Sequence, residues 1–142
     1  MESSTMGKTV VKARITNLRD WLNAKSGDLK PEQVRSVEVE DALVDSGAKY
    51  LCLPKRIIQQ LGLEPFMTRV ANTAAGRVPC NVYDAVRLAI QGRECTIDVS
   101  EVPDTCPVLV GFLPLEALDF VVDPIKQQVV GQHGEQEIIE LY

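Results

Sequence analysis

Apolar and polar residues alternate in several short runs along the chain, and this spacing predicts β-strands. The run over residues 37–43 places Leu43 on the same face as two valines and leaves Ala42 on the other face with two glutamates. We expect that face with Leu43 to be the buried one. The runs that predict strands cover residues 11–16, 37–43, 67–82, 82–90, 95–99, 129–130 and 138–139.

Turn residues divide these runs into hairpins. The run over residues 67–82 is interrupted by Ala74-Ala75-Gly76, which predicts a hairpin with a glycine at its tip. Gln91-Gly92 separates two further runs and has the length of a two-residue hairpin turn. That turn would pair Ile90 with Arg93 and Leu88 with Cys95.

Signals for helices are sparse. Pro54 suits the first turn of a helix, and Gly62 follows the segment KRIIQQL where a C-terminal glycine belongs. Residues 114–118 predict a second short helix. Residues 19–33 are mostly polar and predict a long loop or an insertion. The chain is therefore expected to be mostly β, with one or two short helices.

Composition narrows the class of protein. The chain has 142 residues, 45% of them apolar and 25% charged, which fits one domain with an aliphatic core. Its formal net charge is −5 and no basic stripe is visible, so a nucleic acid is not an expected partner. No apolar run is long enough to cross a membrane. The start, MESSTMGKTV, does not resemble a signal peptide, so we expect a cytoplasmic protein.

The four cysteines are widely spaced, and none of them forms a C-x-x-C motif. This spacing indicates neither a zinc site nor a disulfide framework, so we expect reduced thiols and no bound metal. The single histidine, His133, lies in a polar stretch typical of a solvated loop. The cysteines are Cys52, Cys80, Cys95 and Cys106.

The segment ALVDSGA, residues 42–48, carries the most chemistry. Apolar residues lead directly into Asp45, which places a carboxylate at the edge of the core, and Gly47 permits a tight turn. Asp, Ser and Gly are also common in ordinary turns, so the tripeptide alone is weak. Two later segments strengthen it: the glycine-tipped hairpin, and VLVG at residues 108–111 followed by a short helix.

Taken together, these segments resemble the retropepsin-like aspartic proteases, including the small bacterial members of that clan. ALVDSGA resembles the clan's Asp-(Thr/Ser)-Gly-Ala motif, and LCLPKRIIQQLGL resembles the stretch that follows it. ANTAAGR looks like the flap, and VLVG before LEALDFVVDP looks like the aliphatic-aliphatic-glycine motif with its helix. The resemblance covers residues 8–125. It implies one domain over residues 1–142, built as a small closed β-barrel with a flap hairpin, a loop insertion at 19–33 and a C-terminal extension at 126–142.

The resemblance implies an aspartic endopeptidase with Asp45 as its catalytic residue and no metal or organic cofactor. The chain has one such motif and no room for a second lobe, so the active unit would be a homodimer that acts on a peptide or protein substrate. The other implied site residues fall in three groups: Ser46, Gly47 and Ala48 supporting the catalytic loop, Thr73, Ala74, Ala75 and Gly76 in the flap, and Leu109, Val110 and Gly111 packing beneath the catalytic loop.

One departure concerns the dimer. Retroviral members often have Arg and then Asn or Asp after the late glycine, whereas this chain has Phe112 and Leu113. Two other readings stay open at this point. The domain could be a catalytically silent dimerisation or peptide-binding module, since a fold does not fix a function. An unrelated β-rich binding protein with a chance Asp-Ser-Gly is the third, although it explains neither the flap nor the late glycine motif.

Overall fold

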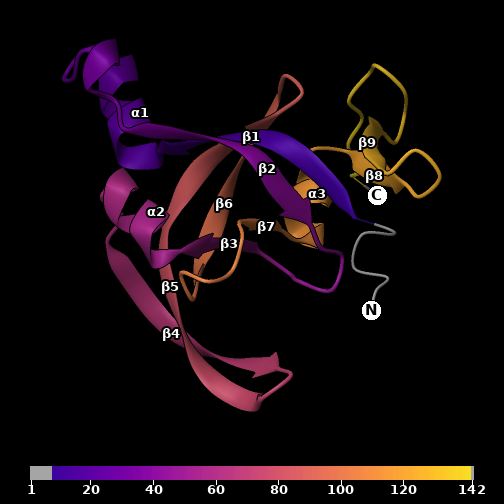
Figure 1. Ribbon diagram of the computed structural model, residues 1–142. Helices are drawn as coiled ribbons and strands as arrows, with labels where there is room; N and C mark the ends of the chain where they lie inside the picture. Colours follow the sequence, from indigo (N-terminus) through magenta and orange to yellow (C-terminus); the bar gives the residue numbers. More distant parts are fainter. Residues whose placement is uncertain (1–7, 142) are drawn as a thin grey trace.

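The structure is a computed structural model that describes residues 8–141 (Figure 1). It is mostly β, with 49% of the chain in strands and 18% in helices. The expectation that the chain starts without a signal peptide concerns residues 1–7, which lie outside the described residues. In chain order the elements are β1 Thr9–Asn17, α1 Leu18–Lys25, the 3₁₀-helix η2 Pro31–Gln33, β2 Ser36–Val44, β3 Leu51–Pro54, α2 Lys55–Leu61, β4 Pro65–Thr73, β5 Gly76–Ile90, β6 Arg93–Val102, β7 Leu109–Val110, α3 Phe112–Ala117, β8 Phe120–Asp123 and β9 Gln128–Gly131.

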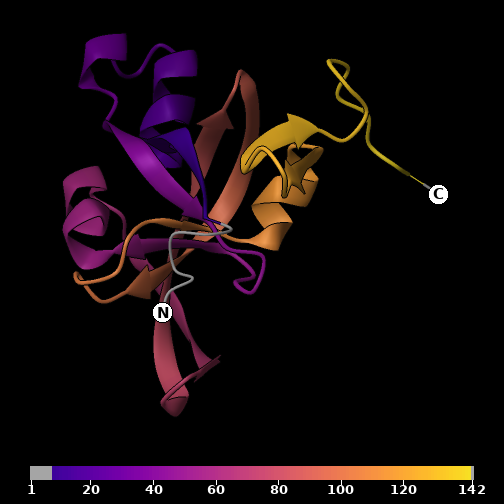
Figure 2. The ribbon, with the colours of Figure 1, turned by 45° about the vertical axis from the view of Figure 1, so that its right-hand side comes forward.

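Seven strands form one sheet in the order β1-β2-β7-β3-β6-β5-β4. An additional antiparallel pairing joins Arg14–Asn17 of β1 to Val86–Ala89 of β5. The sheet order therefore returns to its first strand, and six strands form a ring. β4 stays outside this ring, and with the first half of β5 it projects as a long hairpin (Figures 1 and 2). β8 and β9 form a separate two-stranded sheet.

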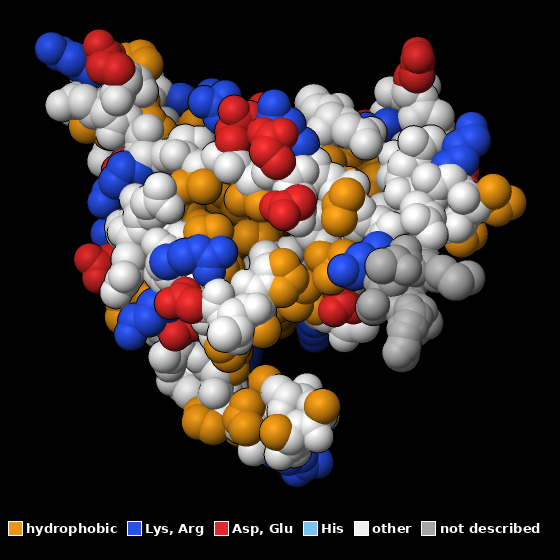
Figure 3. All heavy atoms as spheres, in the orientation of Figure 1, with side chains coloured by type: hydrophobic (Ala, Val, Ile, Leu, Met, Phe, Trp, Pro, Cys, Tyr) orange, Lys and Arg blue, Asp and Glu red, His pale blue; other side chains and the backbone are white. Residues whose placement is uncertain are grey.

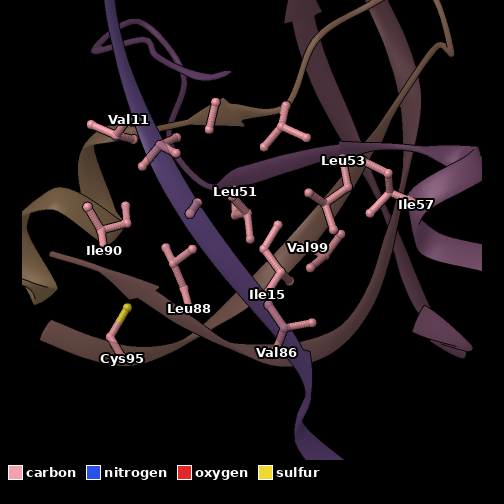
Figure 4. Close-up of a cluster of buried hydrophobic side chains, with 14 of the residues drawn as sticks. Val11, Ile15, Leu51, Leu53, Ile57, Val86, Leu88, Ile90, Cys95 and Val99 are labelled. Atoms are coloured by element: carbon pink, nitrogen blue, oxygen red, sulfur yellow. The ribbon is translucent and has the colours of Figure 1, made fainter. Parts of the chain in front are cut away.

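The core lies inside the ring (Figure 4). It is mostly aliphatic, and the strands of the ring contribute side chains to it, whereas β4 contributes none. Burying one such side chain stabilises the fold by about 1.5–3 kcal/mol. Side chains with no exposed surface include Ile15 of β1, Leu51 and Leu53 of β3, Val86 and Leu88 of β5, and Val99 of β6.

A β-bulge changes which face of β2 is buried. Val11 of β1 pairs with Ala42, whereas Ala13 pairs with Val39, so β2 holds one extra residue between these pairs. An extra residue reverses the alternation of side chains beyond it. The sequence-based placement of Leu43 on the buried face was therefore wrong: Ala42 is fully buried, and Leu43 is half-buried on the outer face.

The expected hairpins are confirmed. β4 and β5 are joined by a turn at residues 74–75. β5 and β6 are joined by Gln91 and Gly92, and both residues have positive φ. A two-residue hairpin turn of type I′ needs positive φ at both positions to match the twist of its strands. The predicted pairs are present: Ile90 with Arg93 and Leu88 with Cys95.

The expected helices are also present. α2 ends at Gly62, whose φ of 66° is the left-handed conformation of a C-terminal glycine. α3 begins at Phe112, two residues before the predicted start. Of the late strands, residues 129–130 lie in β9, whereas residues 138–139 form no strand.

The expected loop over residues 19–33 was wrong, because this segment contains helices α1 and η2. α1 begins at a cap: the Asn17 side chain accepts a hydrogen bond from the Asp20 amide at 2.9 Å and donates one to the Leu61 carbonyl at 2.7 Å. The Asp20 carboxylate then accepts two hydrogen bonds from the Arg35 guanidinium, at 2.8 and 3.0 Å. Polar contacts hold this helix, which explains why the hydrophobic pattern did not reveal it.

Residues 132–138 of the C-terminal extension are fastened around one buried carboxylate. Asp119 accepts hydrogen bonds from His133 Nδ1 at 2.8 Å and from the Ile138 amide at 2.9 Å. Arg93 adds a contact from the other side, since its guanidinium donates to the Gly134 carbonyl at 2.8 Å. We call this arrangement the Asp119 clasp. The sequence had indicated a freely solvated loop histidine. In the structure His133 is instead half-buried and in polar contact with Asp119.

All four cysteines are free thiols, as expected. Within the described residues no helix is long and apolar enough to span a membrane.

Candidate functional site

Asp45 follows the last residue of β2, at the point where β2 runs parallel to β7. Its amide donates a hydrogen bond to the Val110 carbonyl at 3.0 Å, and the Leu43 amide donates one to the Val108 carbonyl at 2.8 Å. The Asp-Ser-Gly segment and the late VLVG segment, far apart in the sequence, are therefore neighbours. This contact fixes the backbone of Asp45 against the short strand β7.

The residues after Asp45 form a tight turn. Asp45 Oδ1 accepts the Gly47 amide at 2.9 Å, and the Asp45 carbonyl accepts the Ala48 amide at 3.0 Å. The Ala48 carbonyl in turn accepts the Phe112 amide at 2.9 Å, at the start of α3. We call residues 45–50 the Asp45 loop. Asp45 is half-buried, while Ser46 and Gly47 are exposed at its tip.

Gly111 is the closest backbone contact beneath the Asp45 loop. A Cβ atom at this position would lie 2.4 Å from the Tyr50 carbonyl oxygen and 2.6 Å from that of Ala48. These are backbone atoms, so no side chain can move aside to make room. The Gly111 amide also donates to the Tyr50 carbonyl at 2.9 Å. The sequence therefore needs glycine here for close packing, and its φ of −80° requires no special backbone conformation.

The strand register places a row of side chains on the outer face of the sheet. Residues that face each other in neighbouring strands point to the same side. Leu43 faces Leu109, Leu109 faces Cys52, Cys52 faces Ser100, and Ser100 faces Val82. Asp45 lies two residues beyond Leu43 on the same side. We call this outer side of the sheet the Asp45 face. In its row Leu43, Leu109 and Cys52 are half-buried, whereas Ser100 and Val82 are buried.

The projecting β4–β5 hairpin borders this face. Its tip is held by Thr73, whose hydroxyl donates to the Gly76 carbonyl at 2.8 Å and accepts the Ala75 amide at 3.2 Å. Gly76 has a φ of 103°, and the space around it is open. A hollow separates the hairpin from the body of the molecule, and hydrophobic side chains gather on the hairpin (Figure 3). Its exposed apolar residues are Phe66, Met67, Val70 and Val78.

Cys52, on the Asp45 face, has a raised pKa. Burial raises the pKa of the Cys52 thiol to about 11, and the nearby groups Cys80, Asp45 and Cys106 add to this rise. An ionised thiolate is thus disfavoured beside Asp45. Among the described residues no group of His, Cys, Asp or Glu side chains could hold a metal ion.

Two cavities of the protein lie away from Asp45. One, of about 320 Å³, lies between α1 and the end of α2; the other, of about 500 Å³, lies between β1 and β9. Asp45 lines neither of them.

The comparison with known families agrees with this geometry. A family model described as aspartyl protease, from the retropepsin-like clan, matches residues 27–112, which is more than half of the chain. The chain therefore belongs to this aspartyl protease family. No curated protein matches the chain.

The structure brings two of the three predicted groups of site residues together. Residues 45–48 contact residues 109–111 directly, through the hydrogen bonds described above. The third group, residues 73–76, lies at the far end of the hairpin (Figure 1). Sequence reasoning missed Tyr50, whose carbonyl meets Gly111 and whose ring lies under Arg69. An aromatic residue soon after Asp-Ser-Gly was the only available signal.

Proposed function

We propose that the protein is an aspartic endopeptidase and that its active unit is a homodimer. The observation that supports this most is the position of Asp45: its backbone is fixed by Val110, and its half-buried side chain lies at the start of an exposed loop tip. One chain supplies one carboxylate. A two-fold axis passing between two Asp45 loops would supply the second, because a symmetric contact brings the same residue of each copy together.

The mechanism follows from the chemistry of two close carboxyl groups. Both cannot be ionised cheaply, so the pair shares one proton. The charged Asp45 takes a proton from a bound water, which attacks the peptide carbonyl carbon. The neutral Asp45 of the other copy donates a hydrogen bond to the carbonyl oxygen. The tetrahedral intermediate collapses as a proton passes to the leaving amine. This reaction requires no metal or organic cofactor.

The remaining proposed roles follow from position. Ser46 is exposed at the tip of the Asp45 loop, where its hydroxyl can form a hydrogen bond across the two-fold axis. Residues 73–76 would close over the substrate and exclude water, since the space around this tip is open. Leu109, Val110 and Gly111 hold the Asp45 loop from below. We propose that residues 1–142 work as one retropepsin-like domain, in a cytoplasmic environment where the cysteines are reduced.

Peptide hydrolysis by the wild type and by Asp45→Asn tests this function. We expect Asp45→Asn to lose hydrolysis by ~100-fold or more, because an amide cannot accept the proton from water. Asp41→Asn, an exposed residue on the same strand, is the matched control and should keep wild-type activity. Normal turnover in Asp45→Asn would place the chemistry elsewhere. A wild type that binds peptides without cleaving them would favour a catalytically silent peptide-binding module.

A further inference from the structure

Arg69 lies over the Asp45 face. It is on β4 opposite Cys80 of β5, and Cys80 points to the same side of the sheet as Val82. The side chain reaches back across the sheet, so that its Cζ atom is 4.9 Å from the centre of the Tyr50 ring. Tyr50 belongs to the Asp45 loop. The hairpin therefore brings a cation to the loop that carries Asp45.

This guanidinium is incompletely satisfied. Its Nη1 atom is buried and has no hydrogen-bond partner. Its Nη2 atom is 4.0 Å from Asp98 Oδ2, which is an ion-pair distance and too long for a hydrogen bond. A buried donor normally has an acceptor, and arginine presents five donors in a fixed plane. The Arg69 side chain as a whole is 36% exposed, so part of it is open to an acceptor from a bound molecule.

A second cation, Lys49, lies near the same Tyr50 ring. Lys49 is exposed, and its Nζ atom is 5.6 Å from the centre of the Tyr50 ring. Its backbone is fixed, because the Lys49 carbonyl accepts the Leu113 amide at 3.1 Å. Two positive charges thus lie against Tyr50, five residues beyond Asp45 in the sequence. Asp98 lies 4.0 Å from Arg69, whereas Lys49 forms no ion pair within the described residues.

We propose that Arg69 and Lys49 form a subsite for an acidic side chain of the peptide substrate. This inference rests on the proposed function, since it concerns the peptide that the Asp45 face would bind. A Glu or Asp carboxylate can accept a hydrogen bond from the exposed part of the Arg69 side chain and lie within the field of Lys49, near the Tyr50 ring. In a homodimer the subsite occurs twice. The preference should then appear at two positions of the peptide, one on each side of the cleaved bond.

The test compares peptides that carry Glu or Gln at each position around the cleaved bond. A charge-assisted hydrogen bond of this kind corresponds to a preference of about 10-fold in kcat/KM for Glu over Gln. Arg69→Met and Lys49→Met should each reduce this ratio, Arg69→Lys should restore part of it, and higher salt should weaken it. Arg77→Met is the matched control. Arg77 lies on the same hairpin, three residues before Cys80, so it points to the opposite side of the sheet and should leave the ratio unchanged.

The ratio separates a subsite from a purely structural Arg69. If Arg69 only supports the hairpin, Arg69→Met lowers kcat/KM for both peptides equally, and the proposal is overturned. Equal cleavage of Glu and Gln peptides by the wild type overturns it as well, while leaving the peptidase intact. If no peptide is cleaved, the proposed function fails. The subsite is then judged by the dissociation constants of the same Glu and Gln peptides for the wild type: a ratio near one rejects it, and a ratio lost in Arg69→Met supports it.

Discussion

The Asp45 amide and the Val110 carbonyl are joined by a hydrogen bond of 3.0 Å. Together with the pairing of Leu43 and Val44, this contact links the end of β2 to β7, and β7 is only two residues long. The position of the carboxylate therefore depends on a short strand and on the glycine that follows it. Changes beneath the Asp45 loop should affect Asp45 as strongly as changes within the loop.

Gly111→Ala should destabilise the protein by about 1–3 kcal/mol and displace the Asp45 loop, because the new methyl group meets two backbone carbonyls. Denaturant unfolding measures the loss. Gly47→Ala is the control: the nearest atom to its Cβ is Asp45 Oδ1 at 3.2 Å, the end of a side chain that can move. Equal stability of Gly111→Ala and the wild type would contradict the close contact.

Phe112→Asp should dissociate the proposed homodimer while the monomer stays folded. Phe112 is 39% exposed and immediately follows Gly111 beside the Asp45 loop, where a second copy would bury it. A buried carboxylate without a partner opposes association. Sedimentation velocity of Phe112→Asp and of Leu22→Asp, which is 48% exposed on α1, provides the comparison. If both variants sediment as the wild type does, the interface lies elsewhere.

Asp20 should make the free energy of unfolding depend on pH in the acidic range. Hydrogen bonds from the Arg35 side chain hold the pKa of Asp20 below its ordinary value, although burial opposes this shift. A lowered pKa in the folded state contributes stability above the unfolded value of ~3.9, and that contribution is lost as pH falls through the folded pKa. Asp20→Asn should therefore cost about 1–3 kcal/mol at pH ~7 and much less at pH ~3. Asp28→Asn, an exposed control on the same segment, should have no such pH dependence.

Cys52 and Cys95 should react slowly with iodoacetamide. Burial is the main cause that raises the pKa of each thiol to about 11. The thiolate is the reactive form, so at pH ~8 alkylation should be roughly 100-fold slower in the folded protein than after unfolding in urea. Mass spectrometry of the alkylated peptides measures each rate. Folded and unfolded rates that agree at Cys52 would mean that its side chain is not buried beside Asp45.

Asp119→Asn should release the C-terminal extension. The Ile138 amide and His133 hold the pKa of Asp119 below its ordinary value, so the clasp is stable above the unfolded pKa and weakens as pH falls through the folded one. An amide at this position removes the charge that Arg93 and His133 face. Limited proteolysis should then cut residues 132–141 faster than in the wild type. Unchanged cleavage would show that Arg93 alone holds the extension.

Local sequence patterns predicted the hairpins and α2 well, because their signals are contained within a few residues. Gln91-Gly92 set a register that the structure repeats pair by pair. The bulge in β2 had no such signal. One extra residue reversed the roles of Ala42 and Leu43, and it did so through pairing with β1, which no local pattern contains. α1 was missed because its contacts are polar and come from Arg35 and Arg87.

The residues of the candidate site also divide into those that local sequence patterns predicted and those that they did not. Asp45 and Gly111 stood out in the sequence through motifs typical of a family, so they were found before their contact was known. Arg69 was not found. Its proposed role rests on its place beside the Tyr50 ring, and an arginine in an alternating strand looks like any solvated side chain. Long-range geometry of this kind leaves no periodic trace.

The pairing between β1 and β5 also determines when the sheet can form while the chain is being synthesised. β1 leaves the ribosome early, yet its partner segment Val86–Ala89 follows much later, and β7 later still. Until then β1 and β2 form a hairpin with open edges, which can pair with other chains. Contacts between such distant segments make folding slow. A nascent chain that pauses before residue 110 holds Asp45 without its anchor, so the proposed active site can form only after β7 has emerged.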